Sequence, residues 1–311
     1  MNKTQNYMEM TTNEGATPLV SIITNTLNRA ALIHRCIESI QKQTYQNYEH
    51  IIVDGASDDN TEEVVKSYND PHIKYIKLDK RGPQIQMRAG MNIAQGKYIT
   101  FLDDDDEYLP EKLEKQVALF ETEPDDVGVV YCWMSYYNND DPTTCIRIHK
   151  TELRGFVGDI VVKKPLVSGT PTMILRKEVF ESEGGTFDDS IGIIGSDWEL
   201  MARICQHTKV DYVPESLVKV YVNHDYARLS TNLLTTKAEK FIKFHTHFLT
   251  RFKDIFERHP DYAENHLYAL VQYNSVLKNR KEAIKYYKQY LTIKTPLKNK
   301  VMALYHILFG R

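Results

Sequence analysis

Short apolar runs alternate with segments of helical periodicity over the first part of the chain. The apolar runs are rich in β-branched residues and predict strands, whereas the segments between them repeat apolar residues every three or four positions and predict helices. The expected strands are 19–24, 48–53, 72–78 and 97–102, and the expected helices are 31–43, 59–67, 84–94 and 110–121. Strands that alternate with helices form a mostly parallel sheet with helices on both faces. The pattern therefore predicts an α/β fold with a Rossmann-like central sheet.

The pattern becomes mixed after residue 126 and wholly helical after about residue 235. The mixed part predicts strands at 127–131, 172–175, 210–213 and 217–223 and a helix at 197–206. The last part begins with a stripe of phenylalanines at helical spacing, followed by expected helices at 262–277, 280–293 and 297–308. We therefore expect a flexible N-terminal segment at 1–17, one α/β domain at 18–235 and a C-terminal helical region at 236–311.

Composition is that of an ordinary globular protein, with 42% hydrophobic and 26% charged residues. The four cysteines are widely scattered and show no zinc-site spacing, so we interpret them as reduced thiols of a cytoplasmic protein. Residues 1–17 are polar, so we expect no signal peptide, and no apolar run reaches the roughly 18–20 residues that span a bilayer.

Charge is distributed unevenly along the chain. Residues 236–311 carry a net charge of +9, and the remainder carries −12, which gives the overall −3. A basic C-terminal region indicates contact with an anionic partner, such as the inner face of a membrane or a phosphorylated acceptor, or docking on the acidic part of the same chain. Nucleic acid is not expected, because no nucleic-acid-binding motif accompanies the charge. Segment 297–308 mixes lysines with apolar residues, which is typical of a helix that lies on a membrane or packs on the preceding helices.

Four consecutive carboxylates, Asp103–Asp106, follow the expected strand 97–102 directly. Such crowding is costly unless a cation lies among the carboxylates, and Mg²⁺ or Mn²⁺ prefers oxygen ligands and often accompanies phosphate. A solvated acidic turn is the alternative. Polar clusters also follow the other three strands, at 24–29, 54–58 and 80–82. Because α/β sheets bind ligands at the carboxyl ends of their strands, the pattern favours a metal–diphosphate site.

Five ordered segments carry most of the polar clusters. They are the opening strand and loop at 20–29, the Asp-Gly-Ala-Ser segment within 52–61, Leu-Asp-Asp-Asp-Asp at 102–106, Ser-Asp-Trp-Glu-Leu at 196–200 and the Tyr-x-x-His…Arg-x-Ser segment at 221–230. Together these segments resemble the motifs of glycosyltransferase family 2. The resemblance implies a GT-A type fold, with a donor half at about 18–125 and an acceptor half at about 126–235. It also implies inverting transfer of a sugar, most naturally from a UDP-sugar, in cell-surface polysaccharide biosynthesis.

The same resemblance implies a role for each candidate residue. The nucleotide side would comprise Thr24, Thr26, Arg29, Asp54, Arg88, Asp103 and Asp104. The Mn²⁺ or Mg²⁺ ligands would be Asp105, Asp106 and His224, the catalytic base would be Asp197, and the diphosphate or acceptor would contact Trp198, Glu199 and Arg228. Plainer roles remain open: Asp54 and Asp197 are also typical helix N-caps, Asp104 is expected to point to solvent, and Trp198 would only pack.

Two other functions compete with this interpretation. A nucleotidyltransferase would need a glycine-rich loop after the first strand to hold a triphosphate, and residues 24–29 contain no glycine. A non-catalytic sugar-binding or scaffold protein derived from a transferase is disfavoured because Asp103, Asp105 and Asp197 are all present. The expected partners are a nucleotide-sugar donor, a glycan or lipid-linked acceptor and, through the basic C-terminal region, the membrane surface.

Overall fold

The computed structural model describes residues 18–165, 169–183, 188, 191–192, 194–222 and 238–310. The chain divides into two compact units, each treated separately below. The first comprises residues 1–157, 167–186 and 207–224, and the second comprises 158–166, 187–206 and 225–311. The second unit therefore takes two segments from the middle of the chain in addition to the C-terminal region that the sequence pattern marks.

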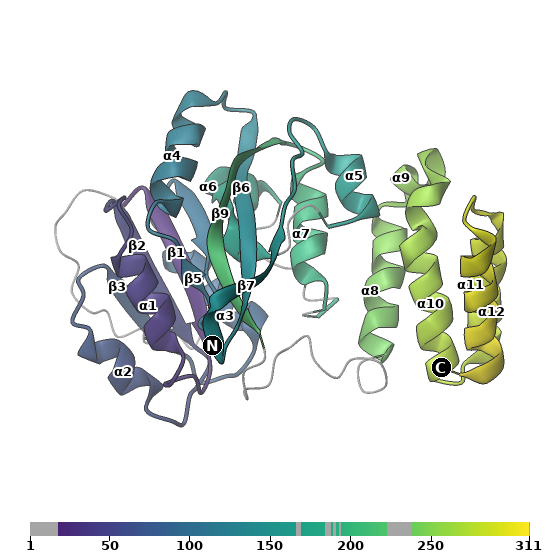
Figure 1. Cartoon of the computed structure of the whole chain (residues 1–311), viewed down its shortest axis with the longest axis horizontal. Coiled ribbons are helices and arrows are strands. Elements are labelled where there is room, and N and C mark those ends of the chain that lie inside the picture. Colours follow the sequence, from purple (N-terminus) through teal and green to yellow (C-terminus); the bar gives the residue numbers. More distant parts are fainter. Residues whose placement is uncertain are drawn as a thin grey trace, which may run out of the picture. The chain divides into compact units, whose positions relative to one another are not determined.

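The first half of the sheet in the first unit is parallel (Figure 1). Its strands lie in the order β3-β2-β1-β4. Their bounds are β1 Val20–Thr26, β2 Tyr48–Asp54, β3 Ile73–Lys77 and β4 Tyr98–Phe101. Each strand occupies the place that the apolar runs predict, and the α/β class is confirmed. The crossover helices are α1 Ile33–Gln41, α2 Thr61–Ser67 and α3 Pro83–Ile93.

The second half of the sheet mixes strand directions and continues in the order β8-β6-β9-β5, with β7 paired to β6. The strands are β5 Glu107–Tyr108, β6 Val127–Asn138, β7 Asp141–His149, β8 Met173–Arg176 and β9 Lys209–Val222. Only β6 and β9 pair in parallel here; β8, β7 and β5 are antiparallel to their neighbours. The helices α4 Lys112–Thr122 and α6 Lys177–Ser182 complete this unit.

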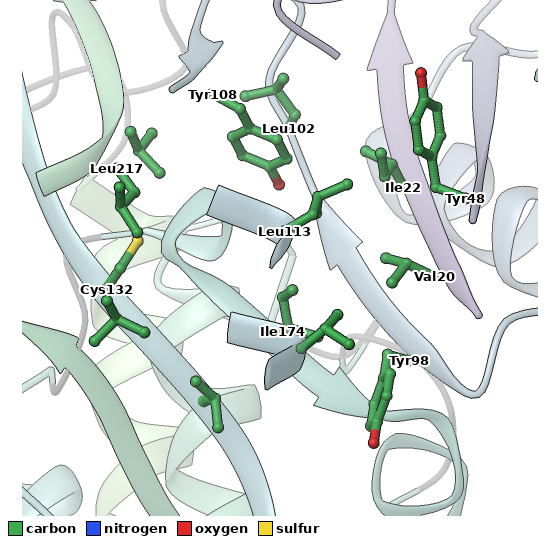
Figure 2. Packing of buried hydrophobic residues seen from close by; sticks show 14 of the residues in the cluster. Val20, Ile22, Tyr48, Tyr98, Leu102, Tyr108, Leu113, Cys132, Ile174 and Leu217 are labelled. Carbon is green, nitrogen blue, oxygen red and sulfur yellow. The ribbon is translucent and has the colours of Figure 1, made fainter. Parts of the chain in front are cut away.

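The core of the first unit lies between the sheet and helices α1 and α4. Figure 2 shows Val20, Ile22, Leu102 and Leu113 among its buried side chains, together with Ile174 of β8. Helix α3 approaches the sheet at Gly90, where a Cβ would lie 2.8 Å from Ile23. The core thus fixes the strands whose carboxyl ends carry the candidate site.

The second unit is helical. Its helices are α5 Gly158–Lys163, α7 Ser196–Ile204, α8 Ala238–Arg251, α9 Lys253–Arg258, α10 Glu264–Val276, α11 Arg280–Thr292 and α12 Leu297–Phe309. Two 3₁₀ turns, Thr170–Thr172 in the first unit and Pro260–Ala263 in the second, complete the list of elements. The phenylalanine stripe is a core feature, because Phe244, Phe248, Phe252 and Phe256 are all buried.

Several bounds differ from the sequence pattern. The two strands expected at 210–213 and 217–223 form the single strand β9, and β6 extends beyond the expected 127–131. The hairpin partner β7 was not expected, because its residues are mostly exposed and polar and only Ile146 and Ile148 alternate with a polar residue. Within the described parts of the chain, no helix is both long enough and apolar enough to cross a membrane.

Candidate active site

The carboxyl ends of β1 and β2 lie side by side, with Thr26 paired to Asp54 across the two strands. The loops that follow are tied together, since the Asn28 amide donates to Ser57 Oγ over 2.8 Å and Asn28 Oδ1 accepts from the Asp58 amide over 2.9 Å. Asn28 adopts a left-handed conformation with φ of 54°, which asparagine tolerates better than most residues. These bonds hold the two loops in one arrangement at the edge of the sheet.

The acidic loop, Asp103–Asp106, follows β4 at the same edge of the sheet. Carboxylate oxygens of Asp103, Asp105 and Asp106 all lie within 4.8 Å of one another. Asp103 is exposed, whereas the other three aspartates are buried. Clustered carboxylate oxygens are the donor set that Mg²⁺ and Mn²⁺ prefer, so these three residues fit a divalent cation.

Asp104 does not point to solvent, contrary to the expectation from the sequence. Its side chain is 8% exposed, and its Oδ2 accepts a hydrogen bond of 2.7 Å from Thr26 Oγ1. Burial, followed by the charge of Asp105, raises the pKa of Asp104 to about 7, although the Thr26 bond and Arg29 oppose the shift. The Arg29 Nη1 atom lies 3.9 Å from Asp105 Oδ2. The loop therefore crowds four carboxyl groups at one strand end, an arrangement that a bound cation would stabilise.

Arg35 of α1 contacts the acidic loop and was missed by sequence analysis. Its Nη1 donates to the Asp105 carbonyl over 3.1 Å, and its Nη2 donates to Asn139 Oδ1 over 3.0 Å. Its guanidinium lies 3.8 Å from the ring centre of Tyr221. The Tyr221 amide in turn donates to Asp106 Oδ1 over 3.1 Å. Arg35 and Tyr221 thus fix the backbone of the loop and one of its carboxylates.

Asp54 is fully buried at the end of β2. Its Oδ1 accepts from the Ser57 amide over 2.8 Å, and its Oδ2 accepts from the Tyr75 hydroxyl over 2.5 Å. Beside it, Gln86 Nε2 donates to the carbonyls of Thr26 and Val53, which joins the ends of β1 and β2. Each carboxylate oxygen has a second lone pair, so the expected contact of Asp54 with a base stays a prediction.

Thr24 does not join this group, and the expected role of Arg88 stays a prediction. Thr24 is fully buried within β1, where its Oγ1 lies 3.0 Å from His50 Nε2 and 3.5 Å from Cys36 Sγ. Arg88 is exposed on α3. The structure thus brings Thr26, Arg29 and the acidic loop together, with Asp54 at the adjacent strand end. His224 and Arg228 lie outside the described residues.

Asp197 lies in the first turn of α7, in the second unit. The residue before this helix, Gly195, has φ of 68° and a Cβ there would lie 2.5 Å from the Phe244 ring. Asp197 is half-buried, and its Oδ1 accepts from the Trp198 amide over 2.9 Å. Loss of hydration raises the pKa of Asp197, and the amide bond opposes this shift. A carboxylate with a raised pKa is a stronger base than a free one.

Trp198 and Glu199 are both held inside the second unit. The Trp198 ring lies 4.9 Å from Phe248 and 5.0 Å from His266, and its Nε1 donates to the Val161 carbonyl over 2.6 Å. Glu199 is fully buried. Its Oε1 lies 2.8 Å from Arg203 Nε and 3.2 Å from Arg251 Nε. These contacts give both residues a structural role in anchoring α7.

A second group of possible metal ligands consists of Asp188, Glu199 and His247. Arg251 contacts two of its members, at 3.8 Å from Asp188 and 3.2 Å from Glu199, and Arg203 contacts Glu199 as well. Guanidinium groups already balance the carboxylates, so a cation would meet like charge here. We interpret the group as an ion-pair network that joins α7 to α8.

Comparison with known proteins decides the family. The sequence model that describes glycosyl transferase family 2 matches residues 21–184, which is just over half of the 311 residues. The chain belongs to glycosyl transferase family 2. It is therefore a transferase, and the resemblance seen in its motifs is confirmed. The matched region contains the acidic loop and both neighbouring strand ends, whereas Asp197 lies beyond it.

Solved structures confirm the fold of this family 2 transferase. S. aureus TarS in complex with UDP-GlcNAc aligns with a TM-score of 0.64 and 15% identity, covering 94% of this chain and 92% of that one. The mannosyltransferase PcManGT of Pyrobaculum calidifontis, in complex with GDP-Man and Mn²⁺, aligns with a TM-score of 0.57 and 18% identity, covering 94% and 88% of the two chains. At these identities the likeness shows the fold alone.

One relative has a name that states its donor, its acceptor and the linkage formed. The E. coli protein WfaP, a UDP-Glc:alpha-D-GlcNAc-diphosphoundecaprenol beta-1,3-glucosyltransferase, is 36% identical over 124 residues. The match covers 40% of this transferase and 48% of WfaP.

Proposed function

We propose that the transferase moves a sugar, with inversion, from a nucleotide-diphosphate donor to a hydroxyl group of a glycan or lipid-linked acceptor in polysaccharide biosynthesis. UDP is the proposed nucleotide. The observation that carries the proposal is the cluster of Asp103, Asp105 and Asp106 at the carboxyl end of β4. It lies at the strand edge where α/β sheets bind ligands, and Arg29 stands beside it.

The acidic loop is the proposed donor site. Asp103, Asp105 and Asp106 would hold Mn²⁺ or Mg²⁺, which supplies stabilisation of negative charge on the departing diphosphate. Arg29 contributes a second positive charge near the diphosphate. Thr26 keeps Asp104 in place. The carboxylate of Asp54 would accept a hydrogen bond from a ring N–H of the nucleobase.

Asp197 is the proposed general base. It takes the proton of the acceptor hydroxyl as that oxygen bonds to the anomeric carbon, and the bond from this carbon to the diphosphate oxygen breaks with its electron pair. Its accessibility supports this role over Glu199, because Asp197 is half-buried whereas Glu199 is fully buried and contacts two arginines. A late proton transfer suits a carboxylate, because the hydroxyl becomes acidic only as the new bond forms.

The names of similar proteins support the donor and the acceptor classes. TarS was solved with UDP-GlcNAc, PcManGT with GDP-Man and Mn²⁺, and WfaP is named for transfer to a sugar on diphosphoundecaprenol. These names favour a nucleotide-sugar donor, a divalent cation and an acceptor linked to a lipid diphosphate.

The test is an assay of nucleotide release. The full chain is incubated with Mn²⁺ and a panel of UDP- and GDP-sugars, and free nucleotide is measured with and without lipid-diphosphate-linked glycans. We expect release from at least one donor that increases when acceptor is added. Asp105→Asn should reduce this rate about a hundredfold or more, because it removes charge stabilisation at the leaving group.

Asp125→Asn is the matched control, since Asp125 is fully exposed and follows the C-terminal end of α4 rather than β4. It should leave the rate unchanged. Equal activity of Asp105→Asn and wild type would contradict the proposed donor site. Binding of nucleotide-sugars without any release would favour a non-catalytic sugar-binding protein instead.

A further inference from the structure

The last helix, α12, exposes a broad apolar face. Its exposed side chains include Leu297, Val301, Met302, Tyr305, Leu308 and Phe309, which are between 40% and 76% exposed. At 100° per residue these positions fall on one side of the helix. Soluble monomers seldom expose contiguous apolar surface of this kind without a partner.

The opposite face of α12 is already packed. Ala303 and His306 are buried, and His306 Nε2 lies 2.9 Å from the Tyr268 hydroxyl of α10. Asn299 Nδ2 donates to Glu264 Oε1 over 3.2 Å at the other end of the helix. Helix α12 is therefore fixed on α10 by its inner face, and the exposed apolar face is a property of the folded unit rather than of a loose end.

The charge around this face is strongly positive. Residues 277–310 contain eight lysines and arginines and a single acidic residue, Glu282. Lys298 lies within the apolar face and is exposed, as are Lys281, Lys285, Lys288 and Lys294 of the neighbouring segment. A second copy of the chain would bring two such basic surfaces together, which like-charge repulsion disfavours. An anionic lipid surface suits both kinds of group, since its acyl chains accept apolar side chains and its phosphates attract lysines.

We propose that α12 and the basic residues of α11 dock the transferase on an anionic phospholipid surface. Apolar side chains enter the boundary between headgroups and acyl chains, while lysines contact the phosphates. Such a surface would keep the enzyme where a lipid-linked acceptor resides. The inference is independent of the proposed reaction, because binding to vesicles is measured without donor or acceptor.

The experiment is vesicle flotation with the full chain. We expect binding to vesicles of phosphatidylglycerol and phosphatidylcholine, weak binding to phosphatidylcholine alone, and a loss of binding as salt is raised. The double variant Val301→Asp with Leu308→Asp should bind roughly tenfold less, because two exposed apolar groups that would enter the lipid become charged. Lys294→Glu with Lys298→Glu should remove the preference for phosphatidylglycerol while leaving the apolar side chains of the face unchanged.

The matched control replaces two exposed isoleucines of β7. Ile146 and Ile148 are 54% and 49% exposed, compared with 55% and 56% for Val301 and Leu308. Ile146→Asp with Ile148→Asp should bind vesicles like wild type. Equal binding of the wild type to both vesicle types would overturn the proposal. A loss of vesicle binding in the β7 control as large as that in Val301→Asp with Leu308→Asp would do the same. So would a stable dimer that Val301→Asp with Leu308→Asp converts to monomer, because a second copy would then cover this face.

Discussion

The guanidinium of Arg35 lies 3.8 Å from the ring centre of Tyr221, and both residues bond to the acidic loop. Arg35 donates to the Asp105 carbonyl, and the Tyr221 backbone donates to the Asp106 side chain. The planar, delocalised guanidinium can stack on a ring while donating from its edge, which a lysine cannot do. This pair sets the position of the residues that we propose as metal ligands.

Arg35→Lys should therefore raise the Mn²⁺ concentration needed for half-maximal activity about tenfold, which corresponds to about 1.4 kcal/mol or roughly one lost hydrogen bond. A titration of activity with Mn²⁺ measures the effect. Arg147→Lys is the control, because Arg147 lies 3.9 Å from the ring centre of Tyr136 on the β7 hairpin. An unchanged metal requirement in Arg35→Lys would mean that the loop is positioned without Arg35.

Asp197→Asn should lower kcat by about 10²–10⁴, the usual contribution of a general base. The KM for the donor should change little, and the amide oxygen can still accept from the Trp198 amide, so folding should be kept. Steady-state kinetics with a fixed acceptor separates the two constants. Asp254→Asn on α9 is an exposed control that should behave like wild type. Full activity of Asp197→Asn would remove its assigned role.

Glu199→Gln should lower the free energy of unfolding by about 3 kcal/mol, because Arg203, 6% exposed, would lose the charge that balances it. Burial raises the pKa of Glu199 more than the charge of Arg203 lowers it, so the intact ion pair itself adds little stability. Urea unfolding measures the loss. Glu257→Gln is the control, since Glu257 pairs with Lys253 at the same helical spacing on the surface, where such pairs contribute up to about 0.5 kcal/mol. Similar losses in both variants would contradict this account.

His245 and His266 should make the protein sensitive to mild acid. Their Nδ1 atoms lie 3.0 Å apart, and burial lowers the pKa of His245 to about 3 and that of His266 to about 4. The unfolded chain, with a histidine pKa of about 6.5, binds protons that the folded chain does not. Stability is therefore complete above about pH 6.5 and falls as pH decreases, by about 2 kcal/mol for each histidine at pH 5.

Urea unfolding at pH 7 and pH 5 tests this prediction. The variant His266→Gln should show a smaller difference between the two conditions than wild type. His207→Gln, which replaces an exposed side chain, should keep the wild-type difference. A pH difference that is the same in all three proteins would mean that the buried pair does not cause it.

The sequence predicts the parallel half of the sheet well, because each strand there is a short apolar run closed by polar residues. It also identifies the acidic loop, since four adjacent aspartates are conspicuous and the nearby strand ends carry polar groups as well. The antiparallel half is harder, because β7 is exposed and its apolar pattern is limited to Ile146 and Ile148.

Arg35 could not be identified from the sequence. It looks like any arginine on an amphipathic helix, and its partners Asp105 and Asn139 lie 70 and 104 residues away along the chain. The burial of Asp104 was missed for a similar reason, since it depends on Thr26, which is 78 residues distant. Long-range pairings of single polar groups carry no local periodicity that could reveal them.

The packing of Trp198 has a practical consequence for shortening the protein. Its ring lies against Phe244 and Phe248 of α8, so the helix that bears Asp197 shares a core with the C-terminal helices. A gene cut near residue 237 would encode every motif of the family and still leave this indole without its aromatic neighbours. Truncation at the apparent domain boundary should therefore yield insoluble or inactive material rather than a minimal enzyme.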